Sequence, residues 1–202
     1  MRVSRDPSFE RNAREFADGL SSLLTRTITY QPLVCSFVGG LNVALVQFRP
    51  DPDVPEQRYV ELENGCWVSV LQRVVPNPED PDRVRTAAYS YSYSLGPDHD
   101  EEWLVRYDYV PERAAQEPEH PYPASHVHVN ASNGSYDEFM RALSEDRPLS
   151  QVHFPTGRIS LEDFVEHLLI EFRVPILYGR SVREALEILE EGREEFRKKR
   201  TS

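Results

Sequence analysis

Two neighbouring runs of alternating residues constrain the fold of this chain most strongly. In the first run, Tyr89, Tyr91 and Tyr93 alternate with small residues, which is the two-residue period of a half-buried β-strand. A segment with glycine, proline and aspartate follows at 96–100, and residues 103–109 then alternate again. We expect this second run to return antiparallel to the first. Its two predicted faces are Trp103, Val105, Tyr107 and Tyr109 on one side, and Leu104, Arg106 and Asp108 on the other.

A third short strand is predicted at residues 125–130. Its alternation places His126 and His128 on one side and Val127 and Val129 on the other,. Two steps of strand rise separate the two histidines by roughly 6–7 Å at the backbone. The sequence therefore predicts two imidazoles that leave one face of a strand together, close to a neighbouring strand that carries Arg106 and Asp108.

The remaining segments predict an α+β fold. Asp6-Pro7 begins an N-terminal amphipathic helix, strands follow at 33–48 and 59–75, and helix-capping sequences begin at Ser135, Ser160 and Ser181,. Because strands come first and helices last, we expect an antiparallel sheet of about six strands, with the N-terminal helix and the C-terminal helices packed on one face. We expect one domain over residues 1–202, with a core at about 8–175 and an amphipathic C-terminal helix at 181–200.

Composition narrows the possible classes of function. The 202 residues carry a formal net charge of -11, which opposes broad, non-specific attraction to nucleic acid, so RNA binding requires a local basic site,. No apolar window is long enough to span a membrane, and the first residues lack the apolar core of a signal peptide, so we expect a cytoplasmic protein. Cys35 and Cys66 lie in apolar surroundings and are expected to be buried free thiols,. Nucleotide-binding and redox motifs are absent from the sequence,.

The order of these elements resembles a known protein family. Tyr91-Ser92-Tyr93, then Arg106-Tyr107-Asp108, then a proline-rich loop and His126-Val127-His128 are similar to the successive strands of the TumE-like group of bacterial and archaeal toxin–antitoxin components. The resemblance covers about residues 85–170. It implies a toxin-type protein that acts on RNA or translation and is encoded with a helix-turn-helix antitoxin as its partner. The family's Arg-Tyr-Asp triplet maps onto residues 106–108 and its paired histidines onto His126 and His128.

The residues themselves also suit RNA cleavage, independently of this resemblance. The reaction needs a base for the 2′-hydroxyl proton, an acid for the leaving oxygen and a cation for the charged transition state. We hypothesise a ribonuclease that uses no metal or other cofactor, with His126 and His128 as acid and base, Arg106 on the phosphate and Asp108 orienting one imidazole. The candidate substrate contacts are Tyr91, Tyr93 and His153.

Three other interpretations stay open, and the sequence does not decide whether the chain is an enzyme. First, the two histidines are ordinary half-buried strand residues. Second, His126 and His128 bind a metal ion, with His153 or Asp137 as a third ligand,. Third, the protein is a non-catalytic binding or assembly protein whose C-terminal helix docks on a partner or forms a homodimer.

Overall fold

The fold is known from a computed structural model of the chain. It describes residues 6–49, 58–80, 82–97, 103–112, 123–130, 152 and 154–201, with side chains described as far as residue 195. The helix predicted after Ser135, Asp137 and His153 lie outside the described residues. None of the described helices is long and apolar enough to cross a membrane.

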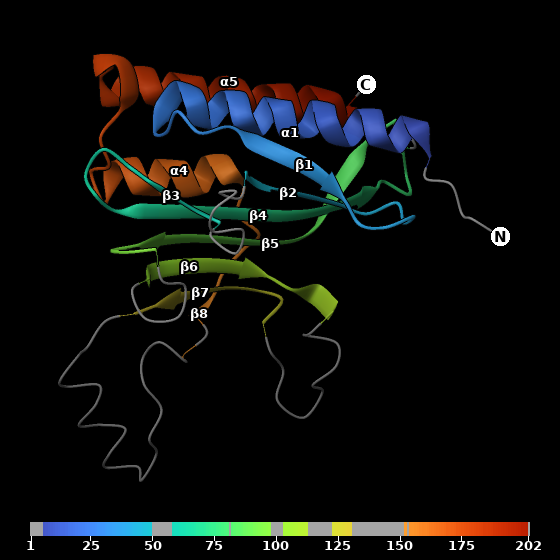
Figure 1. Cartoon of the computed structure of the whole chain (residues 1–202), viewed down its shortest axis with the longest axis horizontal. Coiled ribbons are helices and arrows are strands. Elements are labelled where there is room, and N and C mark those ends of the chain that lie inside the picture. Colours follow the sequence, from blue (N-terminus) through green and yellow to red (C-terminus); the bar gives the residue numbers. More distant parts are fainter. Residues whose placement is uncertain are drawn as a thin grey trace, which may run out of the picture.

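The protein is built on one antiparallel sheet, which confirms the predicted α+β class (Figure 1). Its strands follow the order β1-β2-β4-β5-β6-β7-β8, and β3 pairs with β4 outside this path. The described strands are β1 (Leu33–Phe37), β2 (Ala44–Phe48), β3 (Tyr59–Glu61), β4 (Trp67–Pro76), β5 (Val84–Ser94), β6 (Trp103–Tyr109), β7 (Ser125–Val129) and β8 (Phe154–Pro155). The described residues thus form eight strands where the sequence predicted about six; β3 lies in the predicted 59–75 segment, whereas β8 has only two residues, too few to show an alternation.

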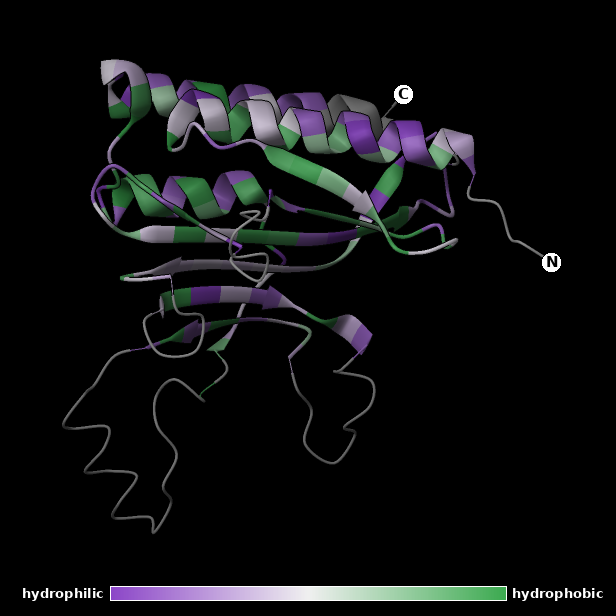
Figure 2. Ribbon diagram, viewed as in Figure 1, coloured by the Kyte–Doolittle hydropathy of each residue, from purple (hydrophilic) through white to green (hydrophobic). Residues whose placement is uncertain are grey.

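Three long helices are described: α1 (Pro7–Thr27), α4 (Leu161–Ile170) and α5 (Val182–Thr201). The Asp6 side chain caps α1, and Ser160 and Asp163 form the capping box predicted for α4,. A short 3-10 helix, η2 (Leu177–Gly179), precedes α5. The α1 and α5 helices lie side by side (Figure 1). Hydrophilic and hydrophobic residues alternate along both of them, as expected of helices with one buried side (Figure 2),.

The helices pack on the face of the sheet that carries the tyrosines, which we call the tyrosine face. Tyr91 pairs across the strands with Val70 of β4 and Tyr107 of β6, so all three side chains point to this face,. The Tyr91 ring also lies 5.4 Å, centroid to centroid, from Phe164 of α4. Buried residues of α1, α4 and α5 complete the same core. The predicted placement of Tyr89, Tyr91 and Tyr93 on one face is therefore correct.

One predicted face assignment is wrong, at the start of β6. The β5–β6 register shifts between Tyr93 and Ser94, so that Tyr93 pairs with Val105 but Ser94 pairs with Trp103. An irregularity of this kind inserts one residue and interrupts the alternation of side chains. Trp103 therefore contacts His128 instead of sharing a face with Val105, while Leu104 packs against the main core.

The two cysteines are free thiols, as predicted. Cys35 and Cys66 are both half-buried rather than fully buried, and both pack against the main core.

Candidate functional site

Arg106, Asp108, His126 and His128 come together on the opposite face of the sheet, which we call the histidine face. Strands β6 and β7 are adjacent, and their register pairs Arg106 with His128 and Asp108 with His126. Directly opposed residues of antiparallel strands point to the same face. The four side chains that the sequence singled out as catalytic thus form one cluster.

The Asp108 carboxylate lies at the centre of this cluster. Its Oδ2 atom is 3.0 Å from Arg106 Nε, 3.5 Å from His128 Nε2 and 3.8 Å from His126 Nε2. The two imidazole rings are 4.8 Å apart, centroid to centroid, and nearly perpendicular at 77°. Both histidines therefore direct Nε2 at the same carboxylate oxygen.

The cluster is buried. His126 is 0% exposed, His128 is 3% exposed and Asp108 is 9% exposed. A carboxylate in such a place is costly unless a positive charge compensates it. Arg106 supplies one positive charge, and its partly exposed guanidinium also lies over the Trp103 ring at 5.2 Å.

A main-chain carbonyl determines which ring nitrogen of His126 carries the proton. His126 Nδ1 lies 2.8 Å from the carbonyl oxygen of Pro123. Because a carbonyl only accepts, Nδ1 must carry the proton and donate it. In neutral His126 the lone pair is then on Nε2, so two acceptors, Nε2 and Asp108 Oδ2, face each other across 3.8 Å. A proton on Nε2, or a metal cation between the two atoms, removes this conflict.

The same arrangement is typical of histidines that bind metals. A metal-binding histidine usually donates its other ring N–H to a backbone carbonyl or a carboxylate, which orients the ring and selects the tautomer. Pro123 has this role for His126. Its contribution could not be predicted from sequence motifs, because it comes from the main chain and depends on the path of the chain into β7.

The distances also suit a metal ion. One ligand atom from each of Asp108, His126 and His128 lies within 4.8 Å of the other two. Ligands of a tetrahedral zinc ion, at bond lengths of about 2.0–2.1 Å, are about 3.3–3.4 Å apart. The observed separations of 3.5 and 3.8 Å from Asp108 Oδ2 approach this value, so small side-chain shifts would complete the three-ligand set.

Trp103 forms a wall of the site that sequence reasoning did not identify. Its ring meets the His128 ring edge to face, with centroids 6.1 Å apart, and contacts the Arg106 guanidinium. Alternation alone predicts Trp103 on the same face as Val105, and the register shift at Ser94 moves it to the histidine face.

Two of the predicted substrate contacts are not brought to this cluster. Tyr91 and Tyr93 lie on the tyrosine face and are 1% and 2% exposed. The sheet itself separates them from His126 and His128, so they cannot contact a ligand bound there. The third predicted contact, His153, lies outside the described residues.

His167 lies outside the cluster and takes part in the packing of α4. The Nδ1 atom of His167, on α4, lies 3.1 Å from the Tyr107 hydroxyl, and its ring stacks on Phe172. It therefore connects α4 to the tyrosine face of β6 and is separate from the candidate site.

Comparison with protein-family models, curated proteins and solved structures finds no match for this chain. The resemblance to the TumE-like family stays a prediction.

Proposed function

We propose that this protein binds a divalent transition-metal ion through Asp108, His126 and His128. The observation that carries the proposal is the convergence of three buried ligand atoms within 4.8 Å of one another. The hydrogen bond from His126 Nδ1 to Pro123 supports it, because it leaves Nε2 as the metal-binding nitrogen,. A bound cation would also compensate the desolvated carboxylate of Asp108.

The donor set favours a particular group of metals. Two imidazole nitrogens and one carboxylate suit Zn²⁺, Fe²⁺ or Co²⁺ better than Ca²⁺ or Mg²⁺, which prefer oxygen ligands. Three protein ligands leave at least one coordination position for water or another small ligand, which is the pattern of catalytic rather than structural zinc sites. The proposed function is therefore a metal centre with an open position.

Cobalt binding tests the geometry of this centre. Chelator-treated protein is titrated with Co²⁺ while its visible absorption is recorded, since the intensity and position of the bands report coordination number. We expect saturable binding with the strong bands of a four- or five-coordinate ion, lost in Asp108→Asn and kept in His167→Gln, the matched control outside the cluster. Weak bands of hexaaqua-like cobalt, or equal binding by Asp108→Asn, would contradict the proposal.

Metal-independent RNA cleavage is a second candidate function. The observation that favours it is the meeting of Arg106 with both imidazoles at a single carboxylate, which supplies a cation, an acid and a base. Burial argues against it, because an RNA phosphate would have to reach rings that are 0% and 3% exposed. A toxin role, with an antitoxin partner, depends on this candidate.

Cleavage of single-stranded RNA in the presence of excess chelator separates the two candidates. The ribonuclease candidate requires cleavage that resists chelation and disappears in the double variant His126→Ala/His128→Ala. The metal proposal requires no chelator-resistant cleavage. A circular dichroism spectrum of the double variant establishes whether the fold is kept.

A further inference from the structure

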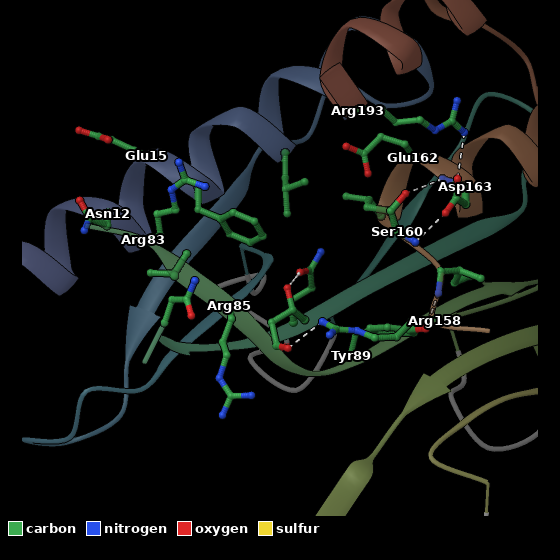
Figure 3. Close-up of a pocket in the computed structure, with 18 of the residues that line it drawn as sticks. Asn12, Glu15, Arg83, Arg85, Tyr89, Arg158, Ser160, Glu162, Asp163 and Arg193 are labelled. Atoms are coloured by element: carbon green, nitrogen blue, oxygen red, sulfur yellow. Dashed lines mark hydrogen bonds and ion pairs between the residues drawn. The ribbon is translucent and has the colours of Figure 1, made fainter. Parts of the chain in front are cut away.

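A second site lies on the other side of the sheet, between α1, β5 and the beginning of α4 (Figure 3). This pocket has a volume of about 740 Å³, within the range of roughly 300–1,000 Å³ that is usual for pockets binding small molecules. Its walls combine apolar side chains, such as Phe16 and Leu20, with polar groups of β5 and α4. The sheet separates it from the Asp108 cluster, so its function does not depend on the proposed metal centre.

Arginines line this pocket, but most of them are already held by other groups. The partners are Asp80 for Arg83, the Thr86 carbonyl and the Tyr109 ring for Arg158, and Asp163, Glu166 and Glu190 for Arg193. Arg85 is exposed, and its guanidinium points away from α1 and α4 (Figure 3). The positive charges at the pocket are therefore largely neutralised or turned outward.

Glu162 supplies a buried negative group at one end of the pocket. It is 3% exposed, and in Figure 3 its carboxyl group points from α4 toward the pocket. Its carboxylate accepts hydrogen bonds from its own backbone amide and from the Ser160 hydroxyl, while burial raises its pKa. None of the ion pairs found within the described ranges includes Glu162. A buried carboxylate with hydrogen bonds but no cation within ion-pair distance favours a positively charged ligand.

These same hydrogen bonds make the pocket a poor anion site. The N-terminus of a helix attracts anions through its free amides. In α4, the Ser160 hydroxyl accepts from the amide of Asp163, and the Glu162 carboxylate accepts from its own amide. Oxygen atoms of the protein already accept hydrogen bonds from these amides. An incoming phosphate or carboxylate would also be repelled by the negative charge of Glu162.

Asn12 lies at the opposite end of the pocket, beside Arg83 (Figure 3). It is 8% exposed, and its Nδ2 atom has no hydrogen-bond acceptor among the described residues. A buried amide donor without an acceptor is unfavourable, so this end of the pocket suits a ligand oxygen. Glu162 and Asn12 are thus complementary to a cation and an acceptor, respectively.

We propose that this pocket binds a small organic amine, with its ammonium group on Glu162. The half-buried ring of Phe16 supplies aromatic surface in the same pocket. Aromatic surface of this kind attracts an ammonium through its π face. The ligand class is a small primary amine.

A matched set of probes tests this assignment. Chelator-treated protein is titrated with aminobutanol, butanediol, hydroxybutyrate and butylamine, and backbone amide shifts are followed by NMR. We expect the two amines to shift the resonances of residues 159–163, and butanediol and hydroxybutyrate to leave them unchanged. No shift with either amine, or an equal response to hydroxybutyrate, would overturn the proposal.

Two variants test which end of the pocket binds the amine. Glu162→Gln keeps the size of the side chain but removes the charge, so the affinity for both amines should fall at least about tenfold. Asn12→Ala should leave the affinity for both amines unchanged, because Asn12 lies about three turns of α1 from the Glu162 end of the pocket and a four-carbon amine is too short to reach both,. Glu187→Gln, an exposed glutamate of α5, is the control and should bind as the unmodified protein does. Unchanged amine affinity in a folded Glu162→Gln protein would contradict the assignment.

Discussion

Arg106 and Asp108 form an ion pair within one strand, with Nε 3.0 Å from Oδ2. Residues two apart on a strand point to the same face, so the pair is a direct consequence of the alternation in β6. The same oxygen faces both histidines. Arg106 therefore competes for Asp108 with any metal ion that the histidines bind.

Replacing Arg106 with glutamine tests this competition. The change removes a positive charge next to the proposed metal ion, so Zn²⁺ affinity should rise by at least a few-fold. The lost charged hydrogen bond should also lower the free energy of unfolding of the metal-free protein by roughly 1.5–3 kcal/mol. Calorimetric Zn²⁺ titration and urea unfolding measure the two effects. Unchanged or weaker Zn²⁺ binding by Arg106→Gln would contradict the competition between Arg106 and the metal ion.

Leu24 tests the packing of α1 on the sheet. Its side chain is 0% exposed and belongs to the main core. Leu24→Ala should lower the free energy of unfolding by about 2–5 kcal/mol, because it removes buried methyl groups and leaves a cavity. Leu41→Ala is the control: Leu41 is 58% exposed, and its loss should change stability by less than about 0.5 kcal/mol. Urea unfolding followed by circular dichroism measures both changes in stability. Equal losses of stability in the two variants would contradict the packing of Leu24 in the core between α1 and the sheet.

Glu162 predicts a specific dependence of stability on pH. Burial raises the pKa of this carboxyl group in the folded protein, so the folded state favours the protonated form. The resulting stabilisation is complete below the unfolded pKa of about 4.3 and is lost as the pH rises through the higher folded pKa. Glu162→Gln should therefore gain stability relative to the unmodified protein between about pH 4 and pH 7.

Urea unfolding of both proteins across this range measures the difference, without added amine. For Glu187→Gln, at an exposed site on α5, the difference in free energy of unfolding from the unmodified protein should be nearly the same at every pH. Parallel curves for Glu162→Gln and the unmodified protein would show that Glu162 is not desolvated in the fold.

Much of the sheet could be predicted from alternation alone. The period of two in β5 placed the tyrosines on one face, and the same period in β6 placed Arg106 and Asp108 together. Asn64-Gly65 marked the β3–β4 turn, where Gly65 has a φ of 77°,. These features depend on neighbouring residues, which is why a sequence reveals them.

Features that depend on distant segments could not be predicted. The sequence placed His126 and His128 on one face but left the depth of their burial open, and in the folded chain they are 0% and 3% exposed. The register shift at Ser94 moved Trp103 to the histidine face. Glu162 was part of a helix-capping sequence, but Asp163 completes the capping box and Glu162 lies at the pocket between α4 and α1.

The most direct test of the metal centre is the number of ions bound per chain. Chelator-treated protein is equilibrated with Zn²⁺, freed of unbound metal by gel filtration, and analysed for metal and protein content. The account predicts one Zn²⁺ per chain for the unmodified protein and for His167→Gln, and almost none for a folded His126→Ala/His128→Ala protein. Unmodified protein without bound zinc, or a double variant that retains the full amount, would contradict it.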